Sequence, residues 1–152
     1  MRDCFGGLPG VAQRCTELAA ELQQALARCR ARPWPGESVL YLIWREPWMT
    51  VARDTYIARM LAEVGWQSWP ALEGGETGAA RYPQLSGGEP WLAQIDRVLL
   101  SSEPYRFDGS HLPLAQALCP QARVQLVDGE LLSWYGPRAA AGLDYLRGLA
   151  VH

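Results

Sequence analysis

The sequence predicts a three-layer αβα domain of the α/β class, with a mostly parallel sheet of about four strands preceded by a long connector-like helix. Apolar runs of strand length alternate with helical apolar patterns, and two of the runs stop abruptly at charged and aromatic residues. These two runs begin the segments VLYLIWREPWMT (residues 39–50) and VQLVDGELLSWY (residues 124–135). Strands of a parallel sheet are buried on both faces, and binding residues gather in the loops at their carboxyl ends.

A long amphipathic helix opens the chain. Between residues 10 and 30, apolar side chains recur at spacings of three or four, which is typical of one helical stripe. The stripe consists of Val11, Cys15, Leu18, Leu22, Leu26 and Cys29. Pro33 and Pro35 end the helix, and the strand pattern SVLYLIW follows. We therefore divide the chain into a leading segment with its helix (residues 1–35) and an α/β lobe (residues 36–152).

Helical and strand patterns then alternate to the end of the chain. Asp54 or Thr55 is positioned to cap a helix that Gly65 stops, and a short strand is expected at 68–72. Beyond a glycine-rich loop, the patterns predict a short helix at 89–95, a strand at 97–101, a short helix at 111–118 and a fourth strand at 124–127. A final helix opens at Gly136 and Pro137. This alternation predicts the parallel sheet.

Composition excludes several classes of protein. The chain has 152 residues, 49% hydrophobic and 20% charged, which fits one globular unit. Its net charge is −2 with scattered basic residues, so we expect no nucleic-acid partner. No window approaches the roughly 18 apolar residues of a membrane span. The start MRDCFGGLPGVAQRC lacks the apolar stretch of an export signal. The four cysteines lack CxxC spacing, which favours buried free thiols.

Four segments carry a resemblance to a known family: residues 39–50, RYPQLS at 81–86, VLLSSEPYRF at 98–107, and residues 124–135. Together they resemble the carboxy-terminal lobe of substrate-binding proteins of ABC importers for cobalamin or ferric siderophores. In this "helical backbone metal receptor" type, one long helix joins two lobes that grip the chelate. The resemblance covers roughly residues 11–149, and we find no counterpart of the amino-terminal lobe.

The resemblance implies a non-catalytic protein that binds a cobalamin-like corrinoid or a ferric siderophore and requires no cofactor. It also implies an ABC permease as partner and a periplasmic location. The location conflicts with the absence of an export signal, so we expect a cytoplasmic protein if Met1 is the genuine start. A single lobe would leave half of the ligand exposed, which predicts weak binding.

Aromatic residues in three loops after strands are the expected ligand contacts, because aromatic faces with a few polar groups suit a planar chelate. The residues are Arg45, Trp48 and Met49 after the first strand, Tyr82 in the YPQ loop, and Glu130 and Trp134 after the fourth strand. The alternative is that Trp44 and Met49 belong to the core and that the charged residues are solvated. Val51–Ala52 stand where the family has Val–Gly, which restricts the loop.

Two contact surfaces are expected outside the ligand site. The resemblance puts Glu89 near the acidic residue that docks on the permease, although a glutamate at the start of a helix also suits the helix dipole. The apolar stripe at 11–29 predicts a homodimer, because proteins usually cover such area.

Two other functional classes remain open at this point. The lobe is alternatively an interaction module that kept the fold and lost the ligand. An enzyme using Glu103, His111 and Asp128 is a third reading, but no GxSxG, GxGxxG or GxxxxGK[ST] motif supports it. We expect no metal site, and Asp108 with His111 is explained equally well by helix capping.

Overall fold

The computed structural model describes residues 9–75, 78–133 and 138–151. Its α-helices are α1 (Pro9–Arg30), α2 (Tyr56–Ala62), α3 (Leu112–Leu118), α4 (Gly129–Ser133) and α5 (Ala139–Ala150). Its strands are β1 (Glu37–Leu42), β2 (Trp48–Met49), β3 (Trp66–Ser68), β4 (Gln84–Leu85), β5 (Arg97–Ser101) and β6 (Arg123–Val127). Short 3-10 helices η1, η2 and η3 span Ala79–Arg81, Pro90–Gln94 and Gly109–His111.

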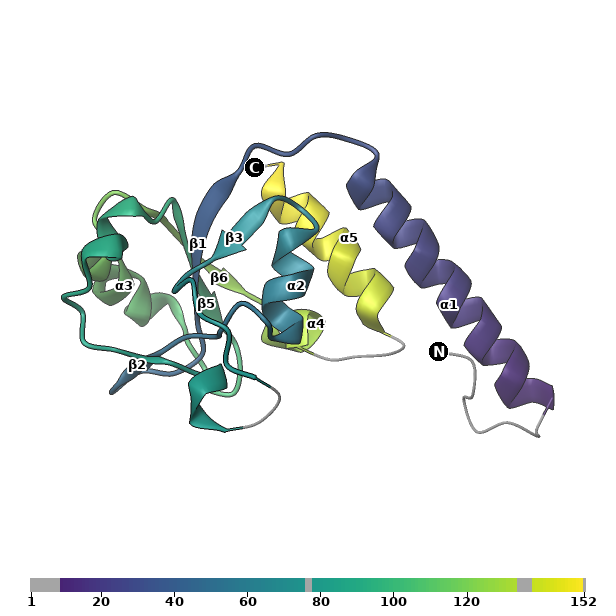
Figure 1. The fold of residues 1–152 in the computed structure, drawn as a ribbon, viewed down its shortest axis with the longest axis horizontal. Coiled ribbons are helices and arrows are strands. Elements are labelled where there is room, and N and C mark those ends of the chain that lie inside the picture. The colour runs from purple at the N-terminus through teal and green to yellow at the C-terminus, as the bar shows by residue number, and fades with distance from the viewer. Residues whose placement is uncertain (1–8, 76–77, 134–137, 152) are drawn as a thin grey trace.

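The predicted α/β class is confirmed: four parallel strands form one sheet in the order β3-β1-β5-β6. Helices lie on both of its faces (Figure 1). Residues of β1 alternate between two hydrophobic clusters, with Tyr41 on the face of α2, α4 and α5, and Leu42 on the face of α3. Because neighbouring strand residues point to opposite faces, a strand buried on both sides reads as continuous apolar sequence.

Helix α1 packs along α5 on the outer side of the first cluster (Figure 1). Ala25 and Cys29 are fully buried there, and Leu22 and Leu26 pack against the same cluster. Arg28 forms an ion pair with Asp144 of α5. The carboxy-terminal half of the apolar stripe, from Leu22 to Cys29, is therefore covered by α5. It cannot contact a second copy of the chain, as the predicted homodimer requires, unless α1 moves away from α5.

Three expectations about local structure are wrong. The strand predicted at 68–72 is β3, which ends earlier, because Pro70 has no N–H for the ladder. Residues 129–133, expected as a loop, form helix α4, because the Asp128 carboxylate accepts the N–H groups of Glu130 and Leu131. Cys15, expected as a free thiol, is disulfide-bonded, whereas Cys29 and Cys119 are free and buried.

A second, two-stranded sheet pairs β2 with β4 in antiparallel register, which the sequence did not predict. It joins the loop after β1 to the YPQ loop, about 35 residues later in the chain. Backbone bonds from Thr50 N to Pro83 O (3.0 Å) and from Ala52 N to Arg81 O (2.8 Å) continue this contact. The two loops are thereby fixed side by side at the carboxyl edge of the main sheet.

Within the described residues, no helix combines the length and apolarity that a membrane crossing requires.

Candidate functional site

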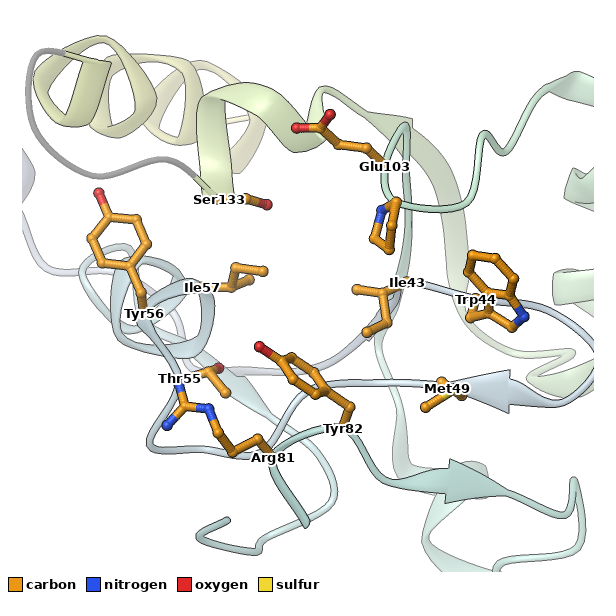
Figure 2. A pocket seen from close by; sticks show the side chains of 11 residues that line it. Ile43, Trp44, Met49, Thr55, Tyr56, Ile57, Arg81, Tyr82, Glu103 and Ser133 are labelled. Atoms are coloured by element: carbon orange, nitrogen blue, oxygen red, sulfur yellow. The ribbon is translucent and has the colours of Figure 1, made fainter. Parts of the chain in front are cut away.

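A cavity of about 450 Å³ lies at the carboxyl edge of the main sheet (Figure 2). Its walls come from the ends of β1 and β5, from β2, from the start of α2, from the YPQ loop and from the end of α4. The lining residues are Ile43, Trp44, Met49, Thr55, Tyr56, Ile57, Arg81, Tyr82, Glu103, Pro104 and Ser133. The volume and the mainly apolar lining are those of a small-molecule site.

The two tryptophans of the loop after β1 lie in different places, one beside the cavity and one in the core. Trp44 and Met49 are paired across an antiparallel bridge, with Met49 N donating to Trp44 O at 3.0 Å. Directly opposed residues point to the same side, and adjacent residues to opposite sides. Trp44 and Met49 therefore face the cavity, whereas Trp48 turns away and stacks on Phe107, with ring centroids 6.1 Å apart.

The other sequence-predicted contacts are dispersed. The Arg45 guanidinium lies 5.5 Å from the Trp48 ring centroid and pairs with Glu46, outside the cavity lining. Glu130 forms a half-exposed ion pair with Arg138 at 3.3 Å on the surface of α4. Trp134 lies outside the described residues. Of the predicted ligand contacts that the structure describes, Met49 and Tyr82 are thus the two that line the cavity.

Tyr82 brings an aromatic ring to the cavity with its hydroxyl directed inward (Figure 2). The ring position follows from the pairing of residues 50–52 with 81–83 described above. Tyr82 and Trp44 are each 40% exposed, so two aromatic faces are accessible from solvent across the same cavity. A large apolar ring that remains partly exposed beside a cavity is well placed for ligand contact.

The opposite wall is held by a hydrogen-bonded chain under the strand ends. Tyr41 Oη donates to Ser101 Oγ at 3.1 Å, and Ser101 Oγ donates to the carbonyl of Glu103 at 2.6 Å. Burial raises the pKa of Tyr41 to about 12, so this hydroxyl stays protonated at neutral pH. Ser101 Oγ also accepts the N–H of Glu103 at 3.2 Å, so this hydrogen-bonded chain fixes Glu103 beside the cavity.

Glu103, His111 and Asp128, the three residues considered for an enzyme, each have a different local environment. Glu103 lines the cavity, but Asp128 caps α4. His111 closes a capping box with Asp108, and its Nε2 lies 3.3 Å from the hydroxyl of Tyr105. Among the described residues, no group of three or more His, Cys, Asp or Glu side chains is arranged to hold a metal ion.

Glu89 organises its own turn. Its carboxylate accepts hydrogen bonds from the N–H groups of Ser86 and Gly87, both at 2.9 Å, and from Ser86 Oγ at 3.0 Å. Partial burial opposes ionisation, but these hydrogen bonds outweigh it and lower the pKa of Glu89. The local role needs no partner protein, so docking through Glu89 stays a prediction.

Sequence reasoning missed most of the cavity lining. Trp44 was not among the expected ligand contacts, with the core as its alternative place, and Tyr56, Ile57 and Arg81 were not expected at the site. The sequence did contain one signal: Trp44 and Trp48 flank a tight turn at Pro47, which is typical of a hairpin. The register of that hairpin decides which of the two tryptophans faces the cavity, and the sequence does not give the register.

No protein-family model matches this chain, and no curated protein matches its sequence. Solved structures do match. The periplasmic vitamin B12 binding protein BtuF of Vibrio cholerae aligns over 91% of this chain and 55% of its own, with 18% identity and a TM-score of 0.64. The periplasmic heme-binding protein RhuT from Roseiflexus sp. RS-1 aligns over 93% and 57%, with 22% identity and a TM-score of 0.67.

A third match is an ABC-type Fe3+-hydroxamate transport system from Saccharomonospora viridis, over 91% of this chain and 50% of its own, with 20% identity and a TM-score of 0.62. This chain thus spans about half the length of the proteins it matches. At these identities the likeness concerns the fold. It confirms the predicted resemblance: the chain has the fold of one part of a substrate-binding protein of the ABC-importer type.

Proposed function

We propose that this chain binds a metal chelate in the cavity at the carboxyl edge of its sheet and does not transform it. The observation that carries the proposal is the pair of accessible aromatic faces, Trp44 and Tyr82, across an apolar cavity. The matched structures are named as binders of vitamin B12 or heme, or as a transport system for Fe3+-hydroxamate. A cobalamin-like corrinoid, a heme or a ferric siderophore is therefore the ligand class.

The proposed ligand lies flat against an apolar floor. Ile43, Met49 and Ile57 supply aliphatic contact, while the Trp44 and Tyr82 rings flank it (Figure 2). Burial of apolar ligand area supplies the affinity, and the hydroxyl of Tyr82 offers one directional contact. Because one lobe covers one side of the ligand, we expect weaker binding than an enclosing site would give.

We further propose delivery of the chelate to an ABC permease outside the inner membrane, with Glu89 at the contact. The matched B12- and heme-binding proteins are described as periplasmic. The disulfide at Cys15 favours the same location, because disulfides persist in oxidising compartments.

A homodimer through the 11–29 helix stays a prediction for the part of the apolar stripe that precedes Leu22. Light scattering at high protein concentration tests this prediction.

Titration of matched tryptophan variants tests the site. We expect saturable 1:1 binding of at least one of cyanocobalamin, hemin and a ferric hydroxamate to the wild-type chain, measured by calorimetry or absorbance. Tyr82→Ala and Trp44→Ala should each weaken binding about 10- to 100-fold, because each removes a large apolar face from the cavity. Trp48→Ala should leave the affinity within about threefold, since Trp48 packs on Phe107 instead.

The outcomes separate the candidate functions. Absence of binding by all three chelates at near-millimolar concentration would reject the proposal and favour an interaction module without a ligand. Loss of binding in Trp48→Ala but not in Trp44→Ala would restore the site expected from the sequence and reject the one built here.

A further inference from the structure

The cavity contains one basic side chain. Among its described lining residues, Arg81 alone carries a positive charge, and Glu103 alone carries a negative one. Arg81 and Glu103 lie on opposite sides of the cavity, with Ile43 and Ile57 between them (Figure 2). A ligand in the cavity therefore meets a different charge at each end, and one orientation of a ligand with an ionised group is favoured over the reverse.

Arg81 is held in place by its backbone surroundings. The N–H groups of Gly74 and Gly75 donate to the two carboxylate oxygens of Asp54, at 2.9 and 2.8 Å. A Cβ atom at Gly74 would lie 2.5 Å from the Arg81 Cα, so the absence of a side chain lets the two segments touch. The Arg81 carbonyl accepts the N–H of Ala52 at 2.8 Å. The backbone that presents Arg81 is therefore fixed before any ligand arrives.

Among the described residues, the Arg81 guanidinium makes one hydrogen bond, in which Nη1 donates to the carbonyl of Gly75, and an arginine has five N–H donors. The nearby carboxylate of Asp54 accepts two backbone N–H groups, and these hydrogen bonds, together with the smaller effect of the Arg81 charge, lower its pKa. A planar guanidinium with spare donors at the edge of an apolar cavity matches a carboxylate or phosphate group in geometry and in charge.

We infer that Arg81 selects chelates that carry an anionic oxygen group, either a carboxylate of a tetrapyrrole side chain or the phosphodiester of a corrinoid nucleotide arm. The inference rests on the proposed function and narrows its ligand class. Chelates without such a group leave the guanidinium unmatched and fit the cavity less well.

Two pairs of ligands differ in whether they carry such a group. Hemin carries two carboxylates that its dimethyl ester lacks, whereas cyanocobalamin carries a phosphodiester, with the ribose and base of its nucleotide arm, that dicyanocobinamide lacks. The wild-type chain should bind the member with the anionic group in one pair about 10- to 100-fold more tightly than the member without it. The pair that shows the preference identifies the source of the anion.

Arg81→Gln should abolish that preference, because it should lower the affinity for the ligand with the anionic group and leave the affinity for the other ligand unchanged. Arg81→Lys, which keeps the charge but not the planar fork, should give an intermediate ratio. Arg59→Gln is the matched control, because Arg59 is exposed on α2, lies outside the cavity lining and removes the same net charge. Its ratio should equal that of the wild-type chain.

The possible failures are distinguishable. Equal binding of acid and ester and of cobalamin and cobinamide, with no effect of Arg81→Gln, would overturn the inference and leave the chelate site standing. Binding of an uncharged ferric hydroxamate, with no binding of hemin or cobalamin, would also overturn the inference and leave the chelate site standing. No binding of any chelate would overturn the proposed function together with the inference.

Discussion

Gly142 of α5 offers a direct test of the packing that holds α4 beside the cavity. A Cβ atom at this position would overlap the carbonyl oxygen of Leu131 in α4 and would lie 2.8 Å from the Cε of Met60. Gly148, further along the same helix, has no neighbouring atom within 4 Å of the equivalent point. Gly142→Ala and Gly148→Ala are therefore the same chemical change in one helix, with and without a steric conflict.

The two substitutions should change the free energy of unfolding in opposite directions. In a helix, alanine is favoured over glycine by about 1 kcal/mol, which should stabilise Gly148→Ala. Overpacking costs about 1 to 3 kcal/mol, and the upper end applies at Gly142 because the obstacle is a backbone oxygen that cannot rotate aside. Subtracting the helix gain leaves Gly142→Ala less stable than the wild-type chain by about 2 kcal/mol.

Urea denaturation followed by circular dichroism measures both changes. The midpoint should fall for Gly142→Ala and rise for Gly148→Ala, with the slope m unchanged. Since Ser133 at the end of α4 lines the cavity, Gly142→Ala should also weaken ligand binding, whereas Gly148→Ala should not. Equal and stabilising effects of the two substitutions would refute the close contact between α4 and α5.

Three further predictions concern titratable groups. Burial raises the pKa of Cys29, and it raises the pKa of Cys119 to about 11. A thiol reagent at pH 8 should therefore modify both cysteines slowly in the native protein and rapidly in urea. Fast labelling of the native protein would contradict their burial. Hydrogen bonds, above all from the Gly74 N–H, lower the pKa of Asp54, so its stabilising contribution is present at neutral pH and is lost as pH falls through that lowered pKa. Asp54→Asn should therefore lower the urea midpoint at pH 7 but differ little from the wild-type chain well below pH ~4, and a constant difference would argue against the carboxylate. Glu37→Gln should cost about 3 kcal/mol because it leaves the buried Arg97 charge without its partner at 3.0 Å, and a neutral result in the same assay would exclude a structural ion pair.

The fold was predictable because its strands carry strong local signals. The run from Val39 to Ile43 is buried on both faces, and β5 has the same pattern from Arg97 to Ser101, so length and apolarity identified both strands. Helix α1 was equally predictable, since its apolar stripe repeats over about five turns.

The cavity was less predictable because it depends on pairing between distant loops. Whether Trp44 or Trp48 faces the cavity is decided by the register of a hairpin, and one residue of slip exchanges them. Arg81 and Tyr82 reach the site only through the β2–β4 pairing, which involves two residues on each strand. Such short strands leave no periodic pattern in the sequence.

Isoleucine methyl NMR with a paramagnetic ferric chelate tests the central claim most directly, because the chain has three isoleucines and they divide between two locations. Ile43 and Ile57 line the cavity, whereas Ile95 is buried in the cluster on the other face of the sheet, next to the start of β5. Paramagnetic broadening falls steeply with distance. A chelate bound in the cavity should erase the Ile43 and Ile57 signals and preserve Ile95, whereas uniform broadening or selective loss of Ile95 would contradict binding at this site.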